Sequence, residues 1–182
     1  MPALSRVLSA FGWAVTARRL PERCVQLEVV NHVKSWNDNY GHASGDALLQ
    51  ELAQLLRAAA SNPGEVVARN GGDEFQRGVC PMLKSRVQSS AERLRASIAA
   101  ADFSGLHAHG SGREEVKISA SIGVACFPVD AQSPSAVLGK ADEAMYHSKK
   151  TGRDGVSFFG LDRTLVRAEA GAAGRTIERR RE

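Results

Sequence analysis

The chain is 182 residues long, with 43% hydrophobic and 24% charged residues and a formal net charge of +4. These proportions are typical of a soluble globular domain with a core of normal size. No apolar run approaches the roughly 18 residues that a transmembrane helix needs. Residues 1–14 lack the basic region, apolar stretch and cleavage site of a signal peptide, so we expect a cytoplasmic protein without membrane contact.

The positive charge gives little support for a nucleic-acid partner. Much of it lies near the two ends of the chain, in Arg18, Arg19, Arg175, Arg179, Arg180 and Arg181. Residues 24–160 carry no basic stripe interleaved with aromatic residues. Binding to nucleic acid is therefore a remote alternative.

The three cysteines are widely spaced, and each lies in a largely apolar segment. They are Cys24, Cys80 and Cys126. An odd number at such spacing predicts reduced core residues rather than a disulfide framework or a zinc site.

Hydrophobic periodicity predicts helices and strands that alternate along the chain. The first half is expected to contain an amphipathic helix over 4–19, a strand over 24–30, a polar link over 32–40 and a helix over 46–59. The second half is expected to contain a helix from Pro81 to 101, a loop over 103–114, a strand over 116–126, a helix from Pro134 to Gly152 and a strand over 156–159. Beyond Leu161 the composition turns to Ala, Gly, Arg and Glu, which predicts a frayed tail.

A glycine pair followed by two acidic residues lies between two short strand-like runs, near 65–69 and 74–79. Asn70-Gly71 is a strong signal for a hairpin turn, so an ordinary β-turn is one interpretation. The other is a loop in which Gly71 and Gly72 let a phosphate approach the backbone, while the carboxylates that follow hold a metal ion. Gln76-Arg77-Gly78 follows where an apolar strand would be expected, which predicts a strand face exposed to solvent or to a partner.

This order of elements predicts an α/β (α+β) domain with a central, mostly antiparallel sheet flanked by helices. A ferredoxin-like or polymerase-palm core satisfies the pattern, and we expect the hairpin at the centre of the sheet.

Four separated motifs, in this order and spacing, resemble the GGDEF domain, the catalytic domain of diguanylate cyclases. They are Asn37-Asp38-Asn39-Tyr40-Gly41-His42 with Gly45-Asp46, then Gly71-Gly72-Asp73-Glu74-Phe75, Ser121-Ile122-Gly123-Val124-Ala125, and Ala141-Asp142-Glu143-Ala144-Met145-Tyr146 with Lys149 and Gly152-Arg153. The resemblance runs from about Val25 to Phe159. It implies a nucleotidyl-cyclase-like palm fold and bacterial second-messenger signalling, in which a homodimer joins two GTP molecules into cyclic di-GMP.

The same resemblance implies a role for each matching residue. Asn37 and Asp46 match the pair that recognises guanine, and an amide with a carboxylate suits the edge of that base. The positions that match phosphate contacts are Gly71, Gly72, Lys34, Lys149 and Arg153. The catalytic, metal-binding positions are Asp73 and Glu74, with the backbone carbonyl of Val30 as a further metal ligand. Simpler roles are also open: Asp46 suits a helix N-terminus, and Lys149 and Arg153 suit a solvated helix C-terminus.

The sequence departs from the family pattern at the end of the first strand. Val29 and Asn31 stand where the family has two metal-binding aspartates, and Glu28 is expected to point to the opposite face. Magnesium prefers charged oxygen ligands, so we expect Mg²⁺ or Mn²⁺ to bind weakly if at all. Upstream of the hairpin, Asn62 and Glu65 replace an Arg-x-x-Asp motif, so no product-inhibition site is expected.

These observations favour a GTP-binding GGDEF domain with impaired cyclase activity. The alternatives are a fully active diguanylate cyclase and a catalytically inactive domain that binds GTP or cyclic di-GMP and regulates a partner. We expect a lead-in over 1–22, the GGDEF domain over 23–160 and a flexible or helical tail over 161–182. An upstream sensor or a downstream effector module on a longer chain would supply the control.

Overall fold

The computed structural model describes residues 23–60, 65–79, 83–107, 115–160 and 162–168, and the structural statements below concern these residues. The helix expected over 4–19, Asn62, Cys80 and Pro81 lie outside them.

A six-stranded sheet organises the chain, with strand order β2-β3-β1-β4-β5-β6. The strands are β1 (Arg23–Asn31), β2 (Val66–Gly71), β3 (Glu74–Val79), β4 (Ser119–Phe127), β5 (Gly155–Phe159) and β6 (Leu165–Arg167). The helices are α2 (Val33–Tyr40), α3 (His42–Ala59), α4 (Lys84–Ala100) and α5 (Pro134–Lys150), with a short 3₁₀ turn at Ser104–Leu106. β4 and β5 pair in parallel and the other neighbours are antiparallel. The predicted α+β class with a mostly antiparallel sheet is confirmed.

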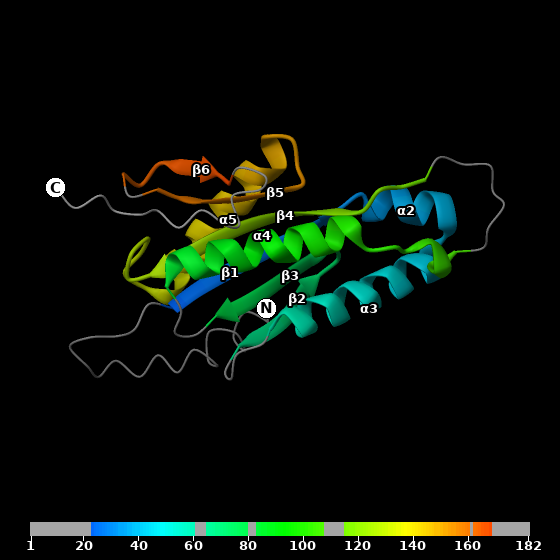
Figure 1. Ribbon diagram of the computed structural model, residues 1–182, viewed down its shortest axis with the longest axis horizontal. Helices are drawn as coiled ribbons and strands as arrows, with labels where there is room; N and C mark the ends of the chain where they lie inside the picture. The colour runs from blue at the N-terminus through cyan, green and yellow to red at the C-terminus, as the bar shows by residue number, and fades with distance from the viewer. Residues whose placement is uncertain (1–22, 61–64, 80–82, 108–114, 161, 169–182) are drawn as a thin grey trace.

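Helices cover both faces of the sheet, which gives three layers (Figure 1). Alternate residues of β1 point to opposite faces, as a strand requires. Val25, Leu27 and Val29 pack against α5, whereas Cys24 and Val30 join the larger cluster with α3 and α4. No helix in the described ranges is long and apolar enough to cross a membrane.

The sequence predicted a polar link over residues 32–40. The structure shows that most of this segment is the helix α2 instead. His32 precedes it in a left-handed conformation with a φ of 71°. Val33 and Trp36 are buried, and their spacing of three places both on the inner face of the helix. Two inward residues in an otherwise polar segment were too few to reveal the helical period.

The hairpin lies at one edge of the sheet rather than at its centre, because β2 is the first strand and β1 and β4 are the middle pair. At the opposite edge β6 pairs antiparallel with β5. The sequence predicted no strand beyond Phe159, since the three residues of β6 are too short to show an alternating pattern.

The expected reduced state of the cysteines is wrong for Cys24 and Cys126, which form a disulfide. The two residues are direct partners in the antiparallel pairing of β1 with β4, a relation that their separation of 102 residues concealed. Both are fully buried, as a core position requires.

The strand face around Gln76 and Arg77 is buried, so the predicted exposed face is wrong. The Arg77 guanidinium lies inside the fold because it finds acceptors there. It donates to the Glu65 carboxylate at 3.0 Å, the Ala59 carbonyl at 2.9 Å and the Ser90 hydroxyl at 3.2 Å. Buried charge is tolerated when it is paired in this way.

Candidate functional site

The tip of the hairpin is a tight turn that a backbone hydrogen bond holds against the neighbouring strand β1. Gly71 and Gly72 have φ values of 143° and 55°, a region that favours glycine. The Arg69 guanidinium donates twice to the Gly72 carbonyl, at 2.7 and 2.9 Å. The Val30 amide donates to the Asp73 carbonyl at 3.0 Å, which fixes the turn against the end of β1. Asp73 and Glu74 thus lie at the hairpin tip, beside the end of β1.

A second group of predicted residues gathers at the corner between α2 and α3. The Trp36 indole donates to the Ser44 hydroxyl at 2.9 Å, and that hydroxyl donates to the Leu106 carbonyl at 2.9 Å. Gly45 packs directly on Asn37, because a Cβ at position 45 would overlap the Asn37 amide oxygen. That oxygen is buried and accepts no hydrogen bond from the described residues. The corner therefore places the Asn37 amide beside the residue before Asp46.

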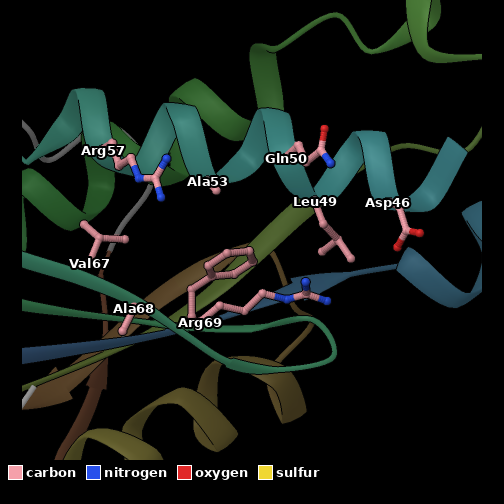
Figure 2. Close-up of a pocket in the computed structure, with 9 residues that line it drawn as sticks. Asp46, Leu49, Gln50, Ala53, Arg57, Val67, Ala68 and Arg69 are labelled. Atoms are coloured by element: carbon pink, nitrogen blue, oxygen red, sulfur yellow. The ribbon is translucent and has the colours of Figure 1, made fainter. Parts of the chain in front are cut away.

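A groove of about 330 Å³ runs between α3 and the hairpin (Figure 2). Its lining combines apolar and charged side chains from both walls: Asp46, Leu49, Gln50, Ala53, Arg57, Val67, Ala68, Arg69 and Phe75. Asp46 lies at one end, and the Arg69 guanidinium points toward that end (Figure 2). The sequence predicted Asp46 here but missed Arg57 and Arg69, since only the packing of α3 over the hairpin brings them to one groove.

The end of β1 lacks the carboxylates that a metal site would need. Val29 is 1% exposed and packs in the apolar cluster with α5. Asn31 is 3% exposed, and its amide is bound to two hydroxyls of β4. It donates to Ser119 at 3.1 Å and accepts from Ser121 at 3.2 Å. Val29 has no oxygen in its side chain, and the Asn31 amide oxygen is neutral and already accepts a hydrogen bond.

Glu28 does not replace the missing ligands. It is 1% exposed, and its neighbours across the sheet, Phe75 and Ile122, belong to the cluster on the α3 and α4 face. Gln26 donates to one carboxyl oxygen at 2.7 Å. Burial raises the pKa of Glu28 to about 8, despite the opposing effects of the Gln26 hydrogen bond and the Arg77 charge. The carboxyl is therefore mostly protonated at neutral pH.

The predicted phosphate-binding cations come from two helices. Lys149 is exposed in the last turn of α5, Arg153 is exposed just beyond it, and Lys34 is exposed in the first turn of α2. α5 is fixed closely to the sheet, since a Cβ at Gly123 would overlap the backbone of Ala141 and Met145. Within the described ranges the three cationic groups make no ion pair, so their charge is available to an anion.

Two carboxylates and one backbone carbonyl are thus what remains for a divalent cation: Asp73, Glu74 and Val30. No group of three or more His, Cys, Asp or Glu side chains in the described part of the chain is arranged to hold a metal. The donor set does not fit a hard cation such as magnesium, which prefers several charged oxygens.

Comparison with known proteins gives a consistent result. The family model described as "Diguanylate cyclase, GGDEF domain" matches residues 23–155. The bifunctional diguanylate cyclase/cyclic di-GMP phosphodiesterase MucR of Pseudomonas aeruginosa is 40% identical over 126 residues, which cover 69% of this chain and 17% of MucR. The chain therefore spans about a sixth of that relative.

Solved structures share the fold over most of the chain. The GGDEF domain of DgcB from Caulobacter crescentus, in complex with c-di-GMP, aligns with a TM-score of 0.72 and 26% identity, covering 85% of this chain and 86% of that one. The GGDEF domain of PA1120 (YfiN or TpbB) from Pseudomonas aeruginosa aligns with a TM-score of 0.68 and 30% identity, covering 88% and 92%.

Proposed function

Since the chain belongs to the GGDEF family of diguanylate cyclases, we propose that it binds GTP in cyclic di-GMP signalling and that its cyclase activity is impaired. The observation that supports impaired cyclase activity is Val29. This residue is 1% exposed within an apolar cluster, at the position where the metal-binding carboxylate is expected. A valine side chain has no atom that can coordinate a cation, and Asn31 offers only a neutral amide oxygen that already accepts a hydrogen bond from Ser121.

The groove supports nucleotide binding together with residues outside its lining. Asp46 lines one end of the groove, and Asn37 lies at the corner of α2 and α3, packed on the neighbouring Gly45. An amide and a carboxylate together can bind the donors on the edge of guanine. Lys149 and Arg153 provide positive charge for a triphosphate, and the glycine turn at the hairpin tip leaves its backbone accessible.

The chemistry of the family joins two GTP molecules held by two facing domains, so any turnover by this chain requires a homodimer. A divalent metal would neutralise charge on the reacting phosphates. The residues here do not fit that ion, so we assign no reaction step to it. The chain's own residues bind the base, with Asn37 and Asp46, and the phosphates, with Lys149 and Arg153. The resulting function is a nucleotide-dependent regulatory domain.

Titration calorimetry with GTP, in magnesium and then in excess EDTA, tests this proposal. We expect GTP to bind with modest affinity and removal of magnesium to change that affinity by less than about tenfold, or ~1.4 kcal/mol. ATP under the same conditions is the control for base recognition and should bind more weakly. A GTP affinity that collapses in EDTA would show an intact metal site, and equal binding of GTP and ATP would refute the assignment of Asn37 and Asp46.

A further inference from the structure

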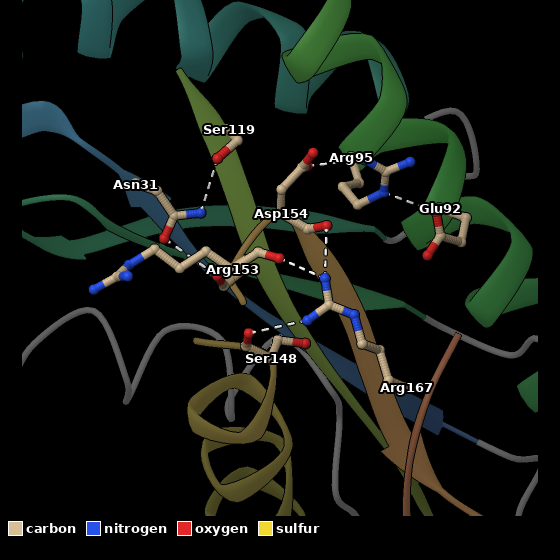
Figure 3. Close-up of polar contacts among 9 residues, drawn as sticks. Asn31, Glu92, Arg95, Ser119, Ser148, Arg153, Asp154 and Arg167 are labelled. Atoms are coloured by element: carbon tan, nitrogen blue, oxygen red, sulfur yellow. Dashed lines mark hydrogen bonds and ion pairs between the residues drawn. The ribbon is translucent and has the colours of Figure 1, made fainter. Parts of the chain in front are cut away.

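A single arginine from the last strand binds the turn that follows α5. Arg167 lies in β6, beyond the residues matched by the family model. Its guanidinium donates to the carbonyl oxygens of Ser148 at 3.4 Å, Thr151 at 2.6 Å, Arg153 at 2.5 Å and Asp154 at 3.1 Å, and to the Thr151 hydroxyl at 3.0 Å. Figure 3 shows three of these contacts, to Ser148, Arg153 and Asp154.

The turn that Arg167 holds has an unfavourable backbone conformation. Arg153 and Asp154 have φ values of 57° and 41°, in the left-handed region that costs a non-glycine residue about 1 kcal/mol or more. Carbonyl groups at the C-terminal end of a helix also lack intrahelical partners and carry partial negative charge. A guanidinium supplies both the donors and the opposite charge, so it stabilises this conformation.

The space for the guanidinium exists because residue 155 is a glycine. A Cβ at Gly155 would lie 2.5 Å from Nη2, 2.6 Å from Cζ and 2.9 Å from Nε of Arg167. Any larger residue there would displace the guanidinium from the turn. The contacts of Arg167 with the turn therefore require a glycine at position 155.

The turn is held from a second side by α4. Arg95 donates to the Asp154 carboxylate at 2.8 Å and to Glu92 in its own helix at 2.9 Å. Both partners raise the pKa of Arg95, against the opposing effect of burial. The Arg153 side chain extends away from Arg167 (Figure 3).

We propose that Arg167 is a positioning residue for the phosphate-binding cations: it fixes the turn after α5 so that Arg153, and with it Lys149, faces the nucleotide. This inference rests on the proposed binding of GTP. It links the segment after the family domain to nucleotide affinity, because any movement of β6 removes the restraint on Arg153.

The test is the ratio of the dissociation constants for GMP and GTP, measured without divalent metal in the whole chain. GMP lacks the β- and γ-phosphates of GTP, so the ratio of the two dissociation constants reports how strongly Lys149 and Arg153 bind those outer phosphates. We expect Arg167→Ala to lower GTP affinity by about tenfold, as expected for lost charge-assisted contacts, and to leave GMP affinity unchanged. Arg167→Lys keeps the charge but not the planar set of donors, so it should restore only part of the loss.

The matched control is Arg163→Ala, which removes one positive charge from the exposed connection between β5 and β6. It should leave the ratio unchanged, which excludes a general effect of net charge. A lower melting temperature with an unchanged ratio in Arg167→Ala would overturn the positioning role and leave the proposed function intact. A parent chain that binds neither nucleotide would refute the proposed function, and the role of Arg167 with it.

Discussion

Replacement of Glu28 by glutamine should remove a large part of the pH dependence of stability. The Glu28 carboxyl has an ordinary pKa of 4.5 in the unfolded chain and a pKa of about 8 in the fold. The folded state therefore holds a proton that the unfolded state releases. This contribution to stability is fully present below about pH 4.5 and is lost as the pH rises to about 8.

The magnitude follows from the proton difference. Each pH unit within that window lowers the free energy of unfolding by about 1.4 kcal/mol, so the loss between about pH 5.5 and 7.5 is about 2 to 3 kcal/mol. Glutamine keeps the size of the side chain and an oxygen that can accept the Gln26 hydrogen bond. Glu28→Gln should therefore be more stable than the parent at the upper pH and lose this part of the slope.

Urea unfolding of both chains at several pH values, followed by circular dichroism, measures the two slopes. The remaining titratable groups are common to both chains, so the difference between the slopes isolates Glu28. Parallel pH profiles for the two chains would show instead that Glu28 is ionised in the fold. If Glu28 is ionised, it also becomes a candidate metal ligand again.

Three further experiments test the site. Val29→Asp combined with Asn31→Asp should raise the production of cyclic di-GMP, measured by chromatography, and should lower the stability of the metal-free chain. The control is Val25→Asp, in the same apolar cluster as Val29. It should destabilise the chain without any gain in product. Asp46→Ala should abolish the preference for GTP over ATP in calorimetry, and a preference that survives would count against the base assignment. Ser44→Ala should lower the free energy of unfolding in urea by about 1 to 3 kcal/mol, because the Trp36 indole and the Leu106 carbonyl lose their common partner; no change would show that water replaces the hydroxyl.

The sequence predicted the long elements well, because their apolar period is carried by many residues. α3, α4 and α5 and the strands β1 and β4 lie close to their predicted positions. The short strands β2, β3 and β5 also lie close to their predicted positions. Two other short elements were missed, since α2 has two buried residues and β6 has three residues in all. The roles that the motifs assign to the site residues stay predictions. The groove residues Arg57 and Arg69 could not be found from motifs, because they depend on how α3 crosses the hairpin. Contacts between distant segments, such as Cys24 with Cys126 and Arg77 with Glu65, leave no local pattern in the sequence.

With Val29 at its metal position, this GGDEF domain should have lost most of its cyclase activity. Incubation of the unmodified chain with GTP and magnesium, and then manganese, at high protein concentration tests it directly, with the products separated by chromatography. We predict that GTP is recovered with little or no cyclic di-GMP. Robust conversion to cyclic di-GMP with either metal would show that the domain is an active cyclase despite Val29.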